Sequence, residues 1–192
     1  MEPQIQYAKT SDGVNIAFAT YGEGRPLVWS NDPVTSHVQR EWHLPNYRAG
    51  ITAFAARGML VRFDTRGAGL SDRDVDDVSL EARVRDLESV VEHLQLKEFS
   101  LLGLETGGVP AIAYAANHPE RVSHLVLLNP GAHSSRHSAW RQLVVDDWEM
   151  YTENVAAGVF GFGSEGSKRY PIQLSDIGPK HRLRQRLPCH RR

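Results

Sequence analysis

The sequence predicts an α/β fold in which helices flank a mostly parallel sheet. Four short apolar runs have the length and composition of buried strands, and they occupy residues 26–30, 59–64, 99–102 and 123–130. Three helix-like segments lie between them, at residues 51–57, 79–94 and 108–118. Strands and helices that alternate at this spacing indicate βαβ units, in which the strands run parallel and both faces of the sheet are covered.

The N-terminal residues predict a β-hairpin that precedes this pattern. The runs at 5–10 and 14–21 flank Ser11-Asp12-Gly13. Because Asp-Gly is a strong signal for a tight turn between two strands, we expect these two runs to pair. The first buried strand then follows after a glycine-containing turn.

Residues 31–50 are interpreted as a loop because they contain Pro33 and Pro45 among polar residues. A helix is predicted at 51–57. It ends before Gly58, a residue type that is common just past helix C-termini. This segment therefore contributes one helix before the second buried strand.

The next helix is predicted to begin after Ser79, whose hydroxyl can cap it. Its apolar residues follow the 3.6-residue helical period, at Leu80, Val84, Leu87, Val91 and Leu94. A strand follows at 99–102 and stops at Gly103. A further helix is expected from Gly108 to His118, with Pro110 in its first turn, where a missing N–H does no harm.

Beyond Pro130 the pattern changes. Residues 136–160 contain an amphipathic helical stretch, whereas residues 161–192 are rich in glycine and then in Lys and Arg, and are expected to be disordered. From residue 168 onward, eight Lys or Arg residues stand against one acidic residue, although the net charge of the chain is −1. This tail has no helical or strand periodicity, and residues 178–192 contain no aromatic side chain to stack on a base. A nucleic-acid partner is therefore not expected.

The remaining sequence signals exclude several classes of protein. The N-terminus has neither a basic start nor an apolar core, and the apolar stretch at 111–116 is too short to span a bilayer, so neither a signal peptide nor a membrane partner is expected. The one cysteine, Cys189, excludes an internal disulfide and favours a cytoplasmic location. No H-E-x-x-H, paired-Cys, P-loop or G-x-G-x-x-G motif is present, so no metal site and no cofactor is expected.

Three motifs occur in a fixed order along the predicted strands. D-x-R-G-x-G-x-S-D covers residues 64–72, G-L-E-T-G-G covers 103–108, and H-P-E-R-V covers 118–122. With these motifs, residues 4–135 resemble the N-terminal two-thirds of the α/β-hydrolase superfamily. The resemblance implies an α/β-hydrolase fold whose core is residues 1–135 and whose sheet stops after strand six. It also implies that residues 136–160 begin a cap or lid helix.

The resemblance further implies a nucleophile elbow, a sharp turn between strand and helix, at residues 103–108. Its tip, where the nucleophile stands, is Glu105. Gly103, Gly107 and Gly108 are expected to be structural, because the backbone of such a turn packs closely against its neighbours. Relatives with a carboxylate nucleophile here, such as epoxide hydrolases and haloalkane dehalogenases, use Asp, which is one methylene shorter than Glu.

The other parts of the catalytic machinery also depart from the family pattern. The oxyanion hole would use the N–H of Thr106 and a donor at Asn31-Asp32, but Pro33 cannot donate, and the charge of Asp32 opposes a developing oxyanion. In the family, the acid and the histidine base follow strands seven and eight, for which no counterpart is expected here. His133 and His137, just past strand six, are the histidines that could substitute.

Three hypotheses follow. In the first, the chain does not hydrolyse a substrate and binds a small ligand in a pocket lined by Asn31, Asp32, Glu105 and Thr106. In the second, it hydrolyses ester or epoxide-type molecules with Glu105 as nucleophile or base. In the third, which is compatible with the first, it is a fragment whose strand six is an exposed edge, and it self-associates through that edge.

Overall fold

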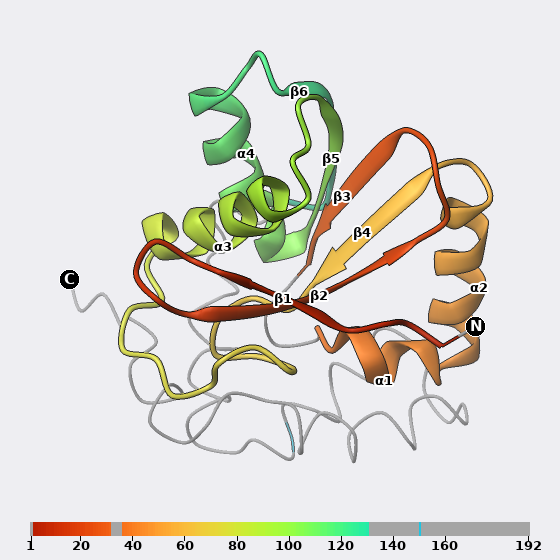
Figure 1. Cartoon of the computed structure of the whole chain (residues 1–192), viewed down its shortest axis with the longest axis horizontal. Helices are drawn as coiled ribbons and strands as arrows, with labels where there is room; N and C mark the ends of the chain where they lie inside the picture. Colours follow the sequence, from red (N-terminus) through yellow and green to blue (C-terminus); the bar gives the residue numbers. More distant parts are fainter. Residues whose placement is uncertain (1, 32–35, 131–149, 151–192) are drawn as a thin grey trace. The chain divides into compact units, whose positions relative to one another are not determined.

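A computed structural model describes residues 2–31, 36–130 and 150 of the chain (Figure 1). The strands are β1 (Gln6–Lys9), β2 (Asn15–Tyr21), β3 (Pro26–Ser30), β4 (Met59–Phe63), β5 (Phe99–Leu104) and β6 (Val122–Leu128). The helices are α1 (Val38–Trp42), α2 (Pro45–Ala55), α3 (Leu80–His93) and α4 (Gly108–Asn117), and a 3-10 turn, η1, covers Glu105–Gly107. Strands and helices alternate from β3 onward, as the sequence predicts.

In the described part of the chain, the strands form one six-stranded sheet with the order β1-β2-β4-β3-β5-β6. Strands β3, β4, β5 and β6 run parallel, whereas β2 pairs antiparallel with both β1 and β4. The predicted α/β fold and the N-terminal hairpin are therefore confirmed. Because β3 lies between β4 and β5, the parallel strands are joined by crossovers, and α2, α3 and α4 lie in them.

Helices cover both faces of this sheet, with α3 and α4 on one face and α2 on the other (Figure 1). Neighbouring strand residues therefore point into different apolar clusters, as Phe18 and Ala19 of β2 do. The cluster under α3 and α4 includes Val28, Val61, Phe63, Leu87, Val91, Leu101 and Tyr114. The cluster under α2 is smaller and includes Tyr21, Leu27, Trp29, Ile51 and Leu60.

The segment interpreted as a loop contains two helices. α1 covers Val38–Trp42, and α2 begins at Pro45, earlier than the predicted start at Ile51. Pro45 is the first residue of α2, a position where the missing N–H costs no hydrogen bond and the fixed φ favours the helix. The loop prediction is therefore wrong for residues 38–42 and 45–50, which are helical, whereas residues 32–35 lie outside the described residues.

The prediction for α3 is confirmed. The Ser79 hydroxyl caps the helix by accepting the Ala82 N–H over 3.2 Å. Of the apolar residues at helical spacing, Leu87 and Val91 are buried, whereas Leu80 at the N-terminus is exposed. The apolar stripe therefore faces the sheet along most of the helix.

β6 differs from the buried strand that the sequence predicts. Among the described residues it is the last strand of the sheet, and Leu125, Val126 and Leu128 are exposed. The prediction that this strand is buried is therefore wrong. An apolar run shows that a strand can be buried, but it does not show which other segments cover it.

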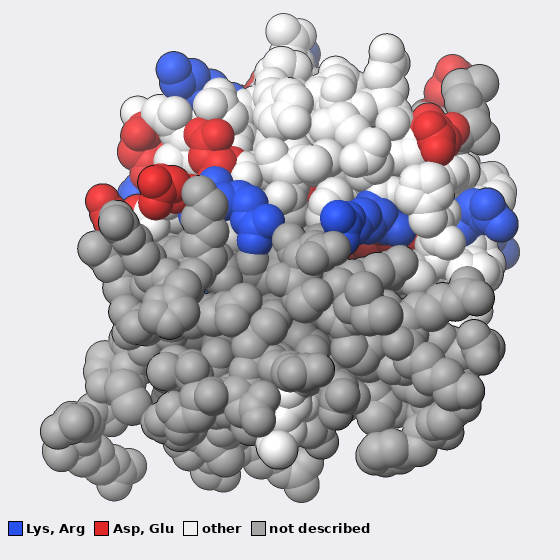
Figure 2. All heavy atoms as spheres, turned by 90° about the horizontal axis from the view of Figure 1, so that it is seen from below, with Lys and Arg blue, Asp and Glu red and all other residues white. Residues whose placement is uncertain are grey.

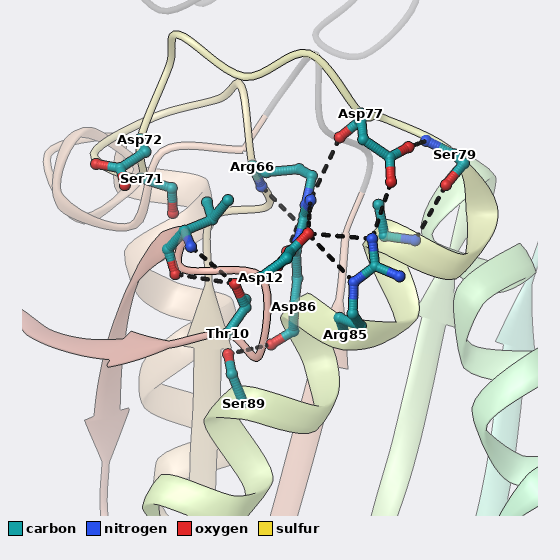
Figure 3. Close-up of polar contacts among 12 residues, drawn as sticks. Thr10, Asp12, Arg66, Ser71, Asp72, Asp77, Ser79, Arg85, Asp86 and Ser89 are labelled. Carbon is teal, nitrogen blue, oxygen red and sulfur yellow. Dashed lines mark hydrogen bonds and ion pairs between the residues drawn. The ribbon is translucent and has the colours of Figure 1, made fainter.

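The loop after β4 is held by the buried side chain of Arg66 (Figure 3). Its Nε donates to Asp86 of α3 over 2.8 Å, and its terminal nitrogens donate to Asp12 over 2.7 and 3.0 Å. Asp12 lies in the β1–β2 turn, next to Gly13, whose φ of +90° is readily available to glycine. The more exposed Arg85 also donates to Asp12. Arg66 thus joins the hairpin turn, the loop after β4 and α3.

Charges of both signs are interspersed over the described part of the face seen in Figure 2. The predicted basic tail from residue 168 lies outside the described residues, and so does the amphipathic stretch at 136–160, apart from Met150. None of the helices in the described ranges is long and apolar enough to cross a membrane.

Replacing Arg66 is expected to destabilise the fold far more than replacing Arg85. Arg66→Met leaves the carboxylate of Asp86, which is fully buried, without its cation, so the free energy of unfolding should fall by about 3 kcal/mol. Arg85→Met also removes an ion pair with Asp12, but a solvent-exposed one, and should cost less than about 1 kcal/mol. Urea unfolding followed by tryptophan fluorescence measures both. Equal losses would contradict a central role for Arg66.

The same network predicts a pH dependence of stability. The hydrogen bond from Arg66 holds the pKa of Asp12 well below its ordinary value of 3.8. Because the pKa is lower in the folded chain, Asp12 stabilises the fold above about pH 4, and this contribution is lost as the pH falls further. Asp12→Asn should therefore flatten the decline of Tm between about pH 4 and pH 2. Asp74→Asn, at an exposed position, is the control and should leave the slope unchanged.

Candidate active-site turn at the carboxyl end of the sheet

Glu105 occupies the tip of a sharp turn between β5 and α4. Its φ is +50°, in the left-handed region that residues with a Cβ rarely adopt. β5 ends one residue earlier, at Leu104, and α4 begins at Gly108. Glu105 is exposed, whereas Gly107 and Gly108 are buried. The turn therefore combines an exposed carboxylate with a strained backbone, at the carboxyl end of a central strand.

The glycines of this turn lie where other segments approach the backbone closely. A Cβ added to Gly103 would lie 2.6 Å from the Cα of Gly108, and one added to Gly107 would lie 2.6 Å from the carbonyl oxygen of Asn31. A Cβ on Gly108 would lie 2.8 Å from the Cβ of Pro130. Real Cβ atoms essentially never approach so closely, so the turn depends on glycine at all three positions.

The carboxyl end of β3 meets the turn at Asn31. Its carbonyl lies against Gly107, and its buried side-chain amide donates to Oε1 of Glu41 over 3.5 Å. The sequence analysis assigned Asn31 to the lining of a ligand pocket beside Glu105. The structure brings Asn31 to the turn through its backbone, while its side chain is engaged with α1.

A buried ion pair that the sequence analysis did not identify lies below this edge. Arg62 of β4 is fully buried and pairs with Glu41 of α1, which also accepts the N–H of His37 over 3.2 Å. The Arg62 guanidinium lies 4.1 Å from the centre of the Trp29 ring. Burial raises the pKa of the Glu41 carboxyl, and the charge of Arg62 opposes that shift. In the sequence, the sign of this pair is Arg62, because it is an arginine within the apolar run that forms β4.

Asp64, the first residue after β4, organises two neighbouring loops. Its buried carboxylate accepts the Ser36 hydroxyl over 2.9 Å and the backbone N–H groups of Val38 and Leu70 over 3.0 and 2.9 Å. A Cβ on Gly69, which has a φ of +50°, would overlap this carboxylate. The first Asp and the last Gly of the D-x-R-G-x-G motif are therefore in direct contact, and they fix the loops after β3 and β4.

Thr106 follows the tip and is held from α3. Its carbonyl oxygen accepts a hydrogen bond from the guanidinium of Arg83 over 3.2 Å. This contact ties the turn to a helix that packs on the same face of the sheet. Arg83 was not identified from the sequence, where it reads as one of several charged residues of an amphipathic helix.

Among the described histidines, His37 is the one placed just after β3, at the start of α1. Its Nδ1 accepts the Arg40 N–H over 3.4 Å, and burial lowers its pKa to about 4. It is therefore neutral near pH 7 and a weak base. His93 packs against Phe18, and His118 is the C-terminal cap of α4, so each of these two histidines has a structural role.

Asp32, His133 and His137 lie outside the described residues, and their roles stay predictions. Within the ranges 2–31 and 36–130, no group of three or more His, Cys, Asp or Glu side chains could hold a metal ion. Among the described residues, this edge presents the exposed side chain of Glu105 and, next to it, Thr106.

Comparison with known proteins identifies the family. A sequence model described as the alpha/beta hydrolase fold matches residues 46–161 of the chain. The chain belongs to the α/β-hydrolase superfamily. The resemblance drawn from the three motifs is thereby confirmed.

Individual relatives of this α/β-hydrolase chain cover several activities. It is 33% identical to a cis-3-alkyl-4-alkyloxetan-2-one decarboxylase of Shewanella oneidensis over 68% of the chain and 40% of the relative. It is 27% identical to a 3-oxoadipate enol-lactonase of Acinetobacter baylyi over 69% of the chain and 48% of the relative. The chain thus spans less than half the length of either. An esterase structure from a Rhodococcus species matches with a TM-score of 0.78 at 22% identity, covering 95% of this chain and 72% of the esterase.

The strain at Glu105 has a measurable consequence for stability. Glu105→Gly removes the cost of a left-handed residue with a Cβ, about 1 kcal/mol, and should raise the free energy of unfolding by up to that amount. Thr106→Gly is the matched control, because Thr106 has no positive φ, and it should lower stability. Chemical denaturation of both variants measures the difference. Destabilisation of the same size at both positions would contradict the strained turn.

Proposed function

We propose that this α/β-hydrolase chain binds a small molecule at the carboxyl ends of β3 and β5, with the Glu105 carboxylate as the recognition group and without hydrolysis. The observation that carries the proposal is the position of Glu105, at the left-handed tip between β5 and α4. This is the nucleophile position of the elbow implied by the family resemblance. Strain retained at such a turn supports a functional role for the residue that bears it.

Two features of Glu105 support binding over nucleophilic attack. Its side chain has one more rotatable bond than Asp, so it holds a carboxylate less firmly within the roughly 3–3.5 Å that attack requires. The described histidine nearest in sequence to the edge of β3, His37, has its pKa lowered to about 4 and is a weak general base. His133 and His137 stay proposals for a histidine partner.

The charges favour a ligand with a cationic or hydrogen-bond-donating group. Glu105 is exposed at the edge, and Asp32 is proposed to face the same pocket. Of the buried carboxylates near the ends of these strands, Glu41 is paired with Arg62 and adds no net charge, whereas Asp64 is held by neutral donors. Together, Glu105, Asp32 and Asp64 disfavour an anion. The names of the relatives refer to an oxetanone, an enol-lactone and esters, which supports a small-molecule ligand.

The alternative function is hydrolysis of small ester or epoxide-type molecules, with Glu105 as nucleophile or base. The observation that favours it is the same strained, exposed position of Glu105 in a family that includes an esterase and a lactonase. Asp32 and Pro33, which stand where an oxyanion hole is expected, weigh against acyl transfer, because the charge of Asp32 opposes a developing oxyanion and Pro33 has no N–H to donate.

Benzylamine tests the binding proposal, because its ammonium form has a positive charge and N–H donors. Calorimetric titration should detect binding to the wild-type chain, and Glu105→Gln should weaken it at least about tenfold, as expected when a charged hydrogen bond is lost. Asp74→Asn, which removes an exposed carboxylate from the loop after β4, is the control and should bind normally. No binding to the wild type, or equal binding to Glu105→Gln, would overturn the role of Glu105.

Measuring substrate turnover distinguishes ligand binding without hydrolysis from hydrolysis. Neither the wild-type chain nor Glu105→Gln should hydrolyse p-nitrophenyl acetate or styrene oxide faster than buffer alone. Turnover by the wild type that disappears in Glu105→Gln would establish the alternative in place of the binding function.

A further inference from the structure

A cavity of about 340 Å³ lies between the N-terminal segment, the end of β2 and the helices α1 and α2. Its volume is at the lower end of the range of about 300–1,000 Å³ that is typical of small-molecule sites. None of its lining residues belongs to β3, β5 or the turn that carries Glu105. In the sheet, β4 and β3 separate β2 from β5, so this cavity is distinct from the site of the proposed function.

One side of the cavity is apolar and aromatic. It is formed by residues of the smaller apolar cluster under α2, which are Tyr21, Trp42, Ile51 and Ala55. The rings of Tyr21 and Trp42 are stacked, with their centres 5.7 Å apart and 19° between their planes. The Tyr21 hydroxyl is already engaged, because it donates to the carbonyl of Val38 over 3.4 Å. This side therefore offers mainly carbon surface, which suits a flat apolar body such as an aromatic ring.

Polar side chains form most of the remaining lining. The neutral ones are Gln4, Gln6, Thr20 and Thr52. Side-chain amides and hydroxyls can both donate and accept hydrogen bonds. The lining also contains the carboxylate of Glu2, whose side chain is 75% exposed, and no described Lys or Arg lines the cavity. These groups match a neutral polar group that both donates and accepts, and they disfavour an anion.

The backbone at the end of β2 fixes part of the shape of this cavity. Gly22, which contributes to the lining, has a φ of +74°, in the left-handed region. A Cβ added to Gly22 would overlap the carbonyl oxygen of Ala55, the last residue of α2. The end of β2 therefore lies directly against α2, an approach that depends on glycine. Because these segments are in contact without a ligand, the cavity is already formed.

We propose that this cavity binds a small, neutral aromatic molecule that carries an amide, with the ring on the apolar side and the amide at the neutral polar side chains. An amide has both a donor and an acceptor, as the side chains of Gln4 and Gln6 do. A cationic ligand is less suited, because Glu2 is largely exposed and its charge is screened by solvent and salt. The inference is independent of the role proposed for Glu105 and adds a second binding site to the chain.

Benzamide and benzoate test the class of ligand, because they share a ring and differ in the polar group. Calorimetric titration of the full chain should detect binding of benzamide. Benzoate should bind at least about tenfold more weakly, because its carboxylate meets no described cation in the lining. A chain that does not bind benzamide, or that binds benzoate equally well, overturns the proposal.

Filling the cavity tests where benzamide binds. Thr52 is an exposed residue of α2 that lines the cavity, whereas the adjacent Ala53 is exposed and does not line it. Thr52→Trp should therefore weaken benzamide binding at least about tenfold, and Ala53→Trp, the matched control, should bind benzamide as the wild type does. Circular dichroism should show the same fold in both variants, since both positions are exposed. Unchanged affinity in Thr52→Trp contradicts the proposed position.

A variant of the turn distinguishes this inference from the proposed function. Glu105→Gln should leave the affinity for benzamide unchanged, because Glu105 does not line the cavity. A loss of benzamide binding in this variant would locate the ligand at the turn and refute the second site.

Discussion

The described fold depends on one buried guanidinium. Arg66 is almost inaccessible to solvent, yet it meets carboxylates from two distant segments, Asp12 in the hairpin turn and Asp86 in α3. A charge removed from water is tolerated only when partners surround it, so these segments must be in place together. Because α3 packs against β1, β2 and α4, this contact joins the hairpin turn and the loop after β4 to the helices on one face of the sheet (Figure 3).

A second set of polar contacts holds the loops at the carboxyl ends of the strands. Asp64 binds the loops after β3 and β4, Glu41 receives Arg62 and the amide of Asn31, and Arg83 holds the carbonyl next to the tip. These groups are engaged with one another below the edge. The exposed carboxylate above them is Glu105. These contacts hold the segments next to the strained, exposed Glu105, which is the proposed recognition residue.

Local signals in the sequence were reliable where the physical cause was also local. The Asp-Gly turn, the Ser79 cap and the alternation of apolar runs with helical segments all predict elements that the structure contains. The sequence failed at Pro45, which reads as a breaker but starts α2. It also failed for Arg62, because an arginine within an apolar strand is informative only once its partner Glu41 is known, and that partner lies on a helix taken for a loop.

By itself, the sequence determined the fold class, the family and the glycines of the turn, since all three follow from residue types at fixed spacing. Only the tertiary structure decided that Glu105 has a left-handed φ, that Asn31 turns its side chain toward α1, and that β6 is exposed. Each of these depends on which segments approach one another across the sheet. The spacing of residues along the chain determines which of them share a face of a strand. Which other segments cover that strand is determined by the tertiary structure.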